Sequence, residues 1–339
     1  VCLAAEGDPV MDFGLRRAQG MDGGLSASRA CYVGGCVGTS NVLAGKIFGL
    51  PVMGTHAHSW VMAFDGEREA FEAFAVAMPD NCVFLVDTYG SVGGVRNAIA
   101  VALKMREQGH QLIGVRLDSG DLAHFSKLAR AMLDEAGLND VVVMGSNELD
   151  ELVIRSLKAQ GAKISAWGVG TKLITAGEEP ALTGVYKLAA IRGPDGDWIN
   201  KIKLSEQKAK TTIPGRLQLY RYHDRAGRMA ADAIMELREE PGTVRMIVDP
   251  NDNTHRKRLH GTVEPEPLLQ TIVERGELVY SLPPLDAIRE RTGEQLRMLD
   301  DSHKRFENPH IYPVGLSPAL NKMRDGMITR ERDLLASGG

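Results

Sequence analysis

Short continuous apolar runs alternate with helical patterns through the first half of the chain. Three such runs, at 82–86, 111–115 and 141–144, each lead into polar residues. Apolar runs of this length are typical of strands that are covered on both faces, as in a parallel sheet. The pattern therefore predicts a parallel sheet in this part of the chain.

Helical periods separate these runs. Apolar residues recur every three or four positions, which predicts helices with one buried face. A glycine follows each stretch, where it can take the left-handed conformation that ends a helix. The stripes and the glycines that follow them are Val95, Ile99 and Leu103 with Gly109, then Leu122, Phe125, Ala129, Met132 and Leu133 with Gly137, then Leu149, Leu152, Val153 and Leu157 with Gly161.

Polar residues cluster directly after successive predicted strands. In a (β/α) barrel the loops after all strands meet at one mouth, where active sites lie. An open doubly wound sheet uses mainly one switch point. Five consecutive strand ends favour the barrel, and we expect an irregular α/β barrel with the active site over residues 1–195. The clusters are 55–58, 87–89, 116–120, 146–147 and 168–171.

The pattern changes beyond the predicted barrel. Turn sequences at 193–197 and 224–227 flank alternating strand patterns such as 218–222. They predict a smaller β-rich domain over 196–284. Two further helical patterns predict a C-terminal helical segment over 285–339.

Composition narrows the class of protein. The chain carries 40 basic and 44 acidic side chains, a net charge of −4, so we expect no nucleic-acid partner. No apolar stretch approaches the ~18 residues of a membrane span, and no signal-peptide pattern is visible. The four cysteines form no CxxC pair and do not fit a zinc ribbon or a disulfide framework. These features predict a cytoplasmic enzyme.

The first candidate site is the segment His56-Ala57-His58. We expect it at a strand end, where residues two apart face the same way, so the two imidazoles can bind one metal ion. A metal-dependent barrel hydrolase would then use Asp87 or Asp118 as well. Such a site needs histidines from later strand ends, and none of those ends supplies one. The alternative for His56 is a hydrogen-bonded structural histidine.

A second candidate is the pair Arg116 and Asp118, which alternate on one face of a strand end. The guanidinium can bind a carboxylate or a phosphate in bidentate fashion. The carboxylate can accept ribose hydroxyls or hold Mg²⁺. Nearby Asp121 is predicted to be the N-cap of the next helix.

Glycine-rich segments indicate phosphate sites. Small residues at 168–171 let backbone N–H groups approach a phosphate, and the threonine hydroxyl adds a donor. A tight turn is the alternative. Segment 182–187 is similar, with Lys187, Lys201 and Lys203 as nearby cations. For the last two, a solvated surface is the alternative.

The segments 12–17 and 38–41 combine an aromatic ring, arginines and hydroxyls. Together they can recognise a flat ring that bears a carboxylate. The alternative for Phe13 is an ordinary core residue.

Taken together, these segments resemble the nicotinate phosphoribosyltransferase family. The resemblance covers nearly the whole chain in order. The matching strings are 12–20 (DFGLRRAQG), 38–45 (GTSNVLAG), 54–60 (GTHAHSW), 116–121 (RLDSGD), 168–171 (GVGT), 184–188 (GVYKL) and 308–316 (NPHIYPVGL).

This resemblance implies transfer of the phosphoribosyl group of 5-phosphoribosyl 1-diphosphate to nicotinate, in NAD biosynthesis. The products would be nicotinate mononucleotide and diphosphate. It also implies coupled ATP hydrolysis through a phosphohistidine at His58, with Mg²⁺ on the diphosphate leaving group. A neutral imidazole suits this role because it is nucleophilic near pH 7.

The resemblance also assigns the binding residues. Phe13 would stack on the pyridine ring. Ser40 lies where nicotinamide-specific relatives carry an aspartate, which attracts an amide and repels a carboxylate, so nicotinamide is disfavoured as the acceptor. Nicotinate would contact Arg16, Thr55 and Arg116; phosphoribosyl diphosphate would contact Arg116, Asp118, Gly168, Gly170, Thr171 and Gly184; and ATP or diphosphate would lie near Lys187, Lys201 and Lys203.

Two positions depart from the family pattern. Val37 stands where many members have an aspartate, and Thr183 replaces a common glycine; we expect both to tune the site. An upstream region of the family is absent and the chain starts at Val1, so we expect a piece of a longer homodimeric enzyme. The alternative is a non-catalytic or incomplete fragment that acts only in dimer assembly.

Overall fold

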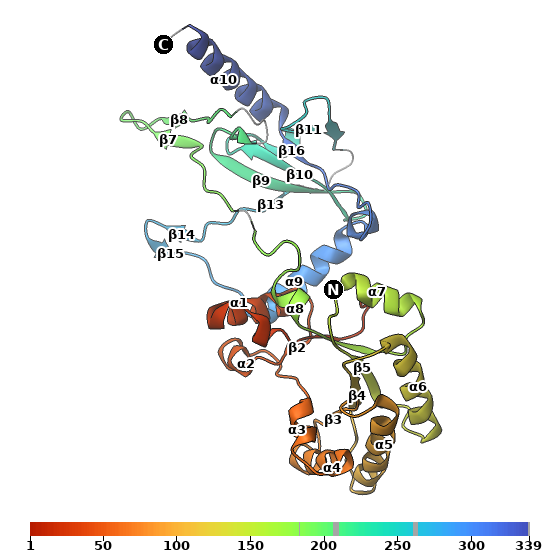
Figure 1. The fold of residues 1–339 in the computed structure, drawn as a ribbon. Coiled ribbons are helices and arrows are strands. Elements are labelled where there is room, and N and C mark those ends of the chain that lie inside the picture. Colours follow the sequence, from red (N-terminus) through yellow and green to blue (C-terminus); the bar gives the residue numbers. More distant parts are fainter. Residues whose placement is uncertain (183, 206–209, 260–263, 338–339) are drawn as a thin grey trace. The chain divides into compact units, whose positions relative to one another are not determined.

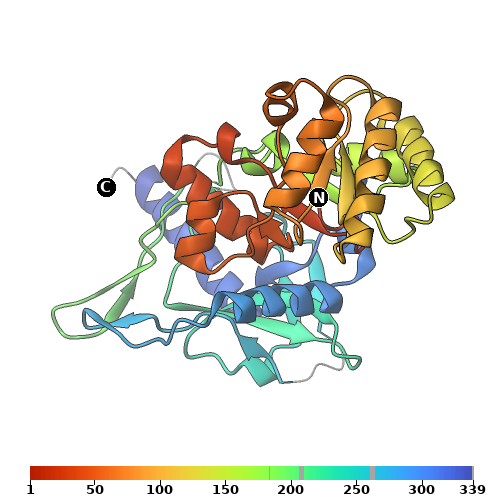
Figure 2. The same cartoon turned by 90° about the horizontal axis from the view of Figure 1, so that it is seen from below.

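The computed structural model describes two compact units, and each is described here by itself. The first unit comprises Val1–Leu182 and Pro284–Thr292, and the second comprises Thr183–Pro283 and Gly293–Gly339. The ribbon is shown in two views (Figures 1 and 2). The residues described are 1–182, 184–205, 210–259 and 264–337.

The first unit is built on a curled parallel sheet that forms half of a barrel. Its strand order is β2-β1-β6-β5-β4-β3, so the last strand in sequence pairs with the first. An isolated parallel bridge between Thr39 and Val52 extends the β2 edge. The α/β class and the barrel-like sheet predicted from the sequence are thus confirmed. The strands are β1 (Val10–Asp12), β2 (Gly38–Thr39), β3 (Val83–Leu85), β4 (Gly114–Leu117), β5 (Val142–Gly145) and β6 (Ala166–Val169).

Helices connect the strands and cover the sheet. Helices α4, α5 and α6 pack against one another beside β3, β4 and β5 (Figures 1 and 2). The predicted N-cap is confirmed, because Asp121 Oδ1 accepts a hydrogen bond from His124 N at 2.9 Å. The helices of this unit are α1 (Gly20–Val33), α2 (Val42–Phe48), α3 (His58–Met62), α4 (Glu67–Ala77), α5 (Ser91–Glu107), α6 (Leu122–Glu135), α7 (Glu151–Ala159) and α8 (Thr171–Ile174), with a 3₁₀ turn at Leu15–Arg17.

The core of the first unit lies between the sheet and these helices. Trp167, Phe71, Phe84 and Leu117 are fully buried there. Burial of each such side chain contributes roughly 1.5–3 kcal/mol. The apolar runs predicted to be strands do form strands, because helices and neighbouring side chains cover both faces of the sheet.

Most of the predicted helical details are confirmed. Gly109, Gly137 and Gly161 follow their helices with φ of 84°, 69° and 71°, which is the left-handed region. Three stripe residues are wrongly placed, since Leu103, Leu152 and Val153 are 40%, 58% and 37% exposed. Some apolar residues at helical spacing lie on the solvent side of these helices. Periodicity alone does not show which apolar residues are buried.

The second unit contains two antiparallel hairpins, β7-β8 and β14-β15, and a six-stranded mixed sheet of order β12-β11-β16-β10-β9-β13. Its core includes Tyr222, Ala231 and Met235. The predicted turn at 224–227 joins two long antiparallel strands. Its elements are β7 (Ala190–Arg192), β8 (Trp198–Asn200), β9 (Leu217–His223), β10 (Met229–Glu236), β11 (Met246–Val248), β12 (Arg256–Arg258), β13 (Glu266–Pro267), β14 (Val273–Glu274), β15 (Glu277–Leu278), β16 (Val314–Leu316) and α10 (Pro318–Ala336).

The C-terminal part is not purely helical. Helix α9 (Leu285–Met298) begins in the first unit, and α10 belongs to the second. Between them β16 pairs in parallel with β10, as in Gly315 beside Ala233. In the part of the chain that the structure describes, no helix is long and apolar enough to cross a membrane.

Candidate active site

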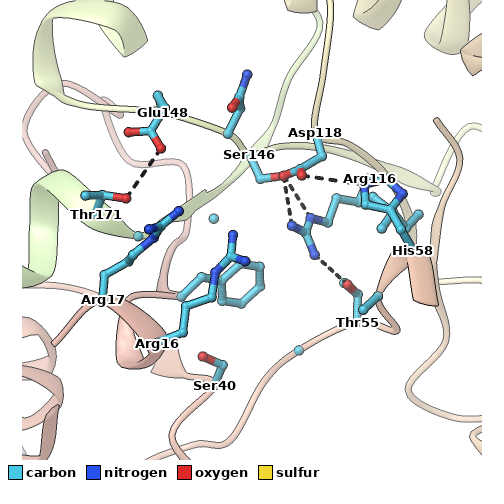
Figure 3. A pocket seen from close by; sticks show the side chains of 17 residues that line it. Arg16, Arg17, Ser40, Thr55, His58, Arg116, Asp118, Ser146, Glu148 and Thr171 are labelled. Carbon is cyan, nitrogen blue, oxygen red and sulfur yellow. Dashed lines mark hydrogen bonds and ion pairs between the residues drawn. The ribbon is translucent and has the colours of Figure 1, made fainter. Parts of the chain in front are cut away.

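The carboxyl ends of the parallel strands surround a pocket of about 350 Å³ in the first unit (Figure 3). Each strand of the sheet contributes residues at or just after its end, as expected for a barrel mouth. The lining residues are Phe13, Arg16, Arg17, Ser40, Gly54, Thr55, Ala57, His58, Leu85, Arg116, Asp118, Ser146, Asn147, Glu148, Gly168, Gly170 and Thr171.

Most of the residues predicted from the sequence meet in this pocket. The second unit holds four others, Gly184, Lys187, Lys201 and Lys203, and none of them is among the described residues that line it. Thr183 lies outside the described residues. The ten predicted residues that line the pocket are Phe13, Arg16, Ser40, Thr55, His58, Arg116, Asp118, Gly168, Gly170 and Thr171.

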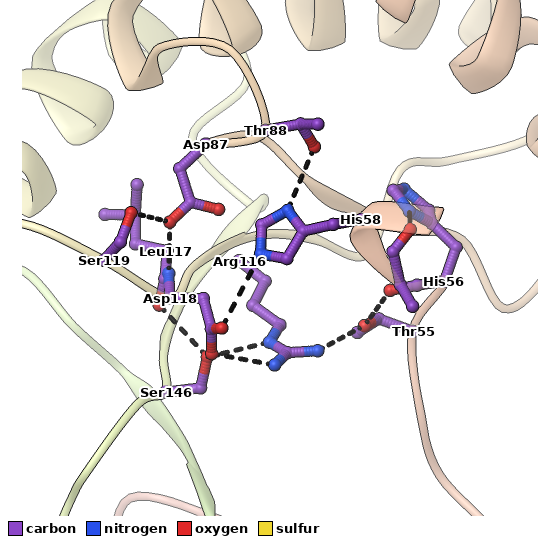
Figure 4. A network of polar contacts seen from close by, with 11 residues as sticks. Thr55, His56, His58, Asp87, Thr88, Arg116, Leu117, Asp118, Ser119 and Ser146 are labelled. Atoms are coloured by element: carbon purple, nitrogen blue, oxygen red, sulfur yellow. Dashed lines mark hydrogen bonds and ion pairs between the residues drawn. The ribbon is translucent and has the colours of Figure 1, made fainter. Parts of the chain in front are cut away.

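The side chain of Arg116 is held in place by three neighbours. Its Nε donates to Ser146 Oγ at 2.8 Å, its Nη1 to Thr55 Oγ1 at 2.9 Å, and its Nη2 to Asp118 Oδ1 at 2.9 Å (Figure 4). The guanidinium carbon lies 5.3 Å from the centre of the Phe13 ring. A guanidinium has five N–H donors, so two remain for a ligand beside an aromatic face.

Asp118 is an ionised carboxylate with protein partners on both oxygens. Oδ1 accepts from Arg116 and from Ser146 Oγ at 2.5 Å, and Oδ2 lies 3.7 Å from His58 Nε2. Burial acts to raise the pKa of Asp118, but the hydrogen bonds from Ser146 and Arg116 and the Arg116 charge outweigh it. The pKa therefore lies below its ordinary value of 3.8.

Asp87 fixes the backbone that carries Asp118. Its Oδ2 accepts from Asp118 N at 2.8 Å and from Ser119 Oγ at 2.6 Å. The sequence marked Asp87 only as an alternative metal ligand, and this positioning role was missed. The feature of the sequence that could have indicated this role is the position of Asp87 at the end of the strand that precedes the Arg116 strand.

His58 opens helix α3 and does not end a strand, so that prediction is wrong. Residues 54–57 form no regular element, and the imidazoles of His56 and His58 point into different surroundings. His58 is 41% exposed; its Nδ1 lies 3.1 Å from Thr88 Oγ1, and its Nε2 faces Asp118 (Figure 4). The side chain is therefore held at one nitrogen and open to the pocket.

His56 is a structural histidine, as the alternative interpretation predicted. It is 6% exposed, its Nε2 accepts from Leu85 N at 3.2 Å, and its ring packs edge-on to Phe74. Burial lowers the pKa of His56 to about 4. Among the described residues no group of three or more His, Cys, Asp and Glu side chains is arranged to hold a metal ion, and the metal-hydrolase prediction has no support.

The Phe13 ring and the glycine-rich segment fit together. A Cβ at Gly168 would lie 2.7 Å from two ring carbons of Phe13, and a Cβ at Gly170 would lie 3.3 Å from its carbonyl oxygen. Phe13 N also donates to Val169 O at 2.8 Å. Glycine at 168 is therefore needed for the ring to face the pocket, because any side chain there would displace it.

Asp12 is a buried residue whose role the sequence did not reveal. It is 0% exposed; Oδ1 accepts from Gly14 N, and Oδ2 accepts from Ser28 Oγ and Thr39 Oγ1, all at 2.8 Å. Its carbonyl oxygen accepts from Ser40 N at 2.9 Å. Asp12 thus joins β1, α1 and β2 and sets the position of Ser40 at the pocket.

Two cations of the pocket are unengaged. Arg16 and Arg17 lie on the 3₁₀ turn after Phe13, and both are exposed. Neither guanidinium has an ion-pair or hydrogen-bond partner in the part of the chain that the structure describes. No role was predicted for Arg17 from the sequence. Free guanidiniums at a pocket favour an anionic ligand.

Val37 does not reach the pocket. It packs against the small cluster of Met11, Met144 and Ala166, and its amide donates to Val10 O at 2.8 Å. Phe13 packs against the same cluster, so an effect of this departure on the ligand site would be transmitted through these neighbours.

Comparison with known proteins points to one family. A family model described as the nicotinate phosphoribosyltransferase (NAPRTase) family matches residues 9–192. A model for the nicotinate phosphoribosyltransferase C-terminal domain matches residues 216–324.

Individual relatives agree with the family models. A nicotinate phosphoribosyltransferase of Bacillus subtilis (strain 168) is 44% identical over 324 residues, which is 94% of this chain and 66% of the relative. One from Mus musculus is 32% identical over 97% of this chain and 70% of its own length. The crystal structure of human nicotinic acid phosphoribosyltransferase has a TM-score of 0.78 at 29% identity, over 96% of this chain and 72% of that chain.

The chain is shorter than these relatives. It spans 66% of the Bacillus subtilis relative, 61% of one from Dictyostelium discoideum and 65% of one from Caenorhabditis elegans. About two thirds of the relatives' length is thus represented here.

Proposed function

The chain belongs to the nicotinate phosphoribosyltransferase family, as its sequence predicted, and from this premise we propose that it transfers the phosphoribosyl group of 5-phosphoribosyl 1-diphosphate to nicotinate. The observation that carries the proposal is one pocket with a tethered Arg116 over the Phe13 ring and the segment 168–171 beside it. These features suit an aromatic carboxylate and a phosphate respectively. The products are nicotinate mononucleotide and diphosphate, in NAD biosynthesis.

Nicotinate binds with its ring on Phe13. Its carboxylate accepts from the two N–H groups that Arg116 has left, and from Arg16. This arrangement directs the ring nitrogen toward the sugar. Ser40 places an uncharged hydroxyl at the same end of the pocket, which leaves the carboxylate unopposed.

Transfer needs no covalent bond to the protein. The bond between the anomeric carbon and the diphosphate oxygen breaks, the diphosphate leaves with the electron pair, and the nicotinate nitrogen supplies a pair to form the new bond. The sugar passes through a cation-like state, so positioning and charge stabilisation carry the catalysis. The ionised carboxylate of Asp118, at the same mouth, stabilises that charge.

We further propose that ATP phosphorylates His58. Nδ1 faces the Thr88 hydroxyl, while Nε2 attacks the γ-phosphorus and ADP leaves. Asp118, 3.7 Å from Nε2, stabilises the positive charge that develops on the ring. Release of the phosphoryl group to water restores the histidine and completes the coupled hydrolysis. Lys187, Lys201 and Lys203 of the second unit remain proposed ligands of ATP or diphosphate.

Mg²⁺ is proposed as a companion of the diphosphate. The described residues supply no three-ligand site, and Mg²⁺ is commonly bound by one or two carboxylates together with substrate phosphates. Asp118 and Glu148 are the carboxylates that line the pocket. Bound there, the ion would neutralise charge on the leaving group.

A homodimer is also proposed. Helix α2 carries the apolar side chains Val42, Leu43 and Ile47, which are 68%, 41% and 53% exposed. Burial of such a cluster in a second copy would stabilise association. Sedimentation analysis of the protein and of Ile47→Lys tests this: a dimer that the substitution weakens is expected, and a monomeric parent protein would refute it.

One experiment tests the transferase and the phosphohistidine separately. The protein, His58→Ala and the exposed control His124→Ala are incubated with γ-labelled ATP, then with nicotinate and phosphoribosyl diphosphate. Acid-labile label is expected on the first and third proteins, with nicotinate mononucleotide formed faster in the presence of ATP.

Each outcome decides one claim. Equal product from the parent protein and His58→Ala would remove the role of His58 but keep the transferase. Absence of product from all three would overturn the transferase and favour an assembly role for this chain.

A further inference from the structure

A short piece of the C-terminal part of the chain belongs to the first unit. Pro284–Thr292, which includes the start of α9, groups with Val1–Leu182, whereas the chain on either side of it belongs to the second unit. This piece supplies none of the described residues that line the pocket. Its side chains instead bind the end of α1 and the turn that follows it.

Arg289 binds the backbone of this turn at three carbonyls. Its Nη1 donates to Tyr32 O at 2.6 Å and to Cys36 O, and its Nη2 donates to Gly35 O at 2.9 Å. These carbonyls lie at or just beyond the C-terminal end of a helix, where backbone acceptors lack helical partners and a positive charge is favoured. A guanidinium suits this place because its donors form a rigid planar fork.

Tyr32 and Asp286 fix the direction of this arginine. The guanidinium carbon lies 4.5 Å from the centre of the Tyr32 ring, and Tyr32 Oη donates to Asp286 Oδ1 at 2.7 Å. Asp286 and Arg289 are three residues apart on α9, so they lie on one face of the helix. Two side chains of α9 therefore hold the end of α1 together.

The turn held in this way leads directly to the nicotinate end of the pocket. Cys36 is followed by Val37, whose amide is hydrogen-bonded to β1 at 2.8 Å and whose side chain packs against the same small cluster as Phe13. Ser40 lines the pocket three residues later. A shift of the Cys36 carbonyl would therefore move Val37 and, through the shared cluster, the Phe13 ring.

We propose that Arg289 is a positioning residue for nicotinate: it holds the turn before β2 and thereby fixes Val37 and the Phe13 ring on which nicotinate lies. The assignment rests on the proposed phosphoribosyl transfer. Arg289 touches neither the substrate nor the reacting atoms. Its loss should therefore weaken the binding of nicotinate more than it slows the step at the anomeric carbon.

Steady-state kinetics tests the role on four proteins: the parent protein, Arg289→Ala, Arg289→Lys and Arg297→Ala, which removes an exposed arginine of the same helix. In Arg289→Ala the nicotinate KM should rise about tenfold, while kcat stays within about threefold of the parent value. Arg289→Lys should show an intermediate KM, because an ammonium keeps the charge but not the planar fork. Arg297→Ala should match the parent protein.

Chemical rescue adds a readout that a general loss of structure would not give. Guanidinium ion at millimolar concentration, far below the denaturing range, can occupy the space that Arg289→Ala leaves beside the three carbonyls. It should return the nicotinate KM of Arg289→Ala toward the parent value and leave that of Arg297→Ala unchanged.

Hydrogen exchange tests the same role without a substrate. The amides of Val37 and Ser40 donate to β1, and they should exchange about tenfold faster in Arg289→Ala than in the parent protein. The amide of Val142, which donates to Ile113 O at 2.9 Å on the far side of the sheet, should be unaffected.

The outcomes separate this proposal from the one on which it rests. An unchanged nicotinate KM in Arg289→Ala, a rise that Arg297→Ala shares, or a fall in kcat alone overturns the role of Arg289 and leaves the transferase standing. If Arg289→Ala does not fold, a parent-like KM in Arg289→Lys overturns it. Absence of product from every protein overturns the proposed function, and unchanged exchange at Val37 and Ser40 would then refute the positioning role as well.

Discussion

The buried His56 should make the first unit less stable in mild acid. Burial, with smaller contributions from the charges of Arg116 and His58, lowers its pKa to about 4 from an ordinary 6.5, against an opposing hydrogen bond to Ala57 O. Protonation of Nε2 would also remove the acceptor for Leu85 N at the end of β3. Acid should therefore loosen the strand that borders the pocket.

The sign and size follow from proton linkage. Between pH 6.5 and pH 4 the unfolded chain binds a proton at this residue and the folded chain does not, so the free energy of unfolding falls as the pH falls. The interval between the two pKa values corresponds to about 3 kcal/mol. Above pH 6.5 the residue is neutral in both states and adds no pH dependence.

The matched variant is His56→Gln, which keeps an acceptor for Leu85 N but does not titrate. His124→Gln, on the exposed side of α6, serves as control. Urea unfolding is followed between pH 7 and pH 4.5 by tryptophan fluorescence, to which Trp60 and Trp167 contribute from the first unit and Trp198 from the second. The parent and control should lose about 2.5 kcal/mol more than His56→Gln over this range, which stops short of the folded-state pKa. Parallel stability curves for the parent and His56→Gln would refute the reasoning.

Three predictions concern the ligand site. Gly168→Ala should displace the Phe13 ring, because the new Cβ would lie 2.7 Å from it, and should raise the nicotinate KM by about tenfold or more. Gly93→Ala, on the exposed side of α5 with open space around its Cβ, should leave the KM unchanged, and steady-state kinetics of both variants checks this. Arg116→Lys should lower kcat/KM for nicotinate by about a hundredfold, since an ammonium cannot reproduce three directed hydrogen bonds and a bidentate contact; a loss below threefold would contradict the assigned geometry. Ser40→Asp should shift the ratio of kcat/KM toward nicotinamide over nicotinate, and an unchanged ratio would show that this position does not read the carboxylate.

The sequence located the pocket because parallel strands bring their carboxyl ends to one edge. Arg116, Asp118 and Gly168 were found in this way, and each lies at a strand end in the structure. The same reasoning failed for His56 and His58, since a spacing of two is equally compatible with an irregular segment that leads into a helix. Strand β16 was missed for a related reason: three residues are too short to show a period.

The positioning residues escaped prediction because their partners are distant in the sequence. Asp12 binds Ser28 and Thr39, which are 16 and 27 residues away, and Asp87 binds the amide of Asp118, 31 residues away. Nothing in the local pattern distinguishes such a carboxylate from one that faces solvent. Only the folded chain shows which acid holds a loop and which one is free for a ligand.

The same distinction between fixed and free side chains applies to the cations of the pocket. It shows how a chain of net charge −4 can still present a pocket suited to the anionic substrates proposed above. Arg116 is fixed by Asp118, and Asp118 is fixed through its amide by Asp87, so one cation has a set position before any ligand arrives. Arg16 and Arg17 have no such tether among the described residues. A fixed guanidinium costs little conformational entropy on binding and defines the orientation of the ring, whereas the free ones lose rotamer freedom when a phosphate or carboxylate engages them. Orientation should therefore depend on Arg116 and affinity on the other two, which is why local placement of charge, and not its total, governs recognition here.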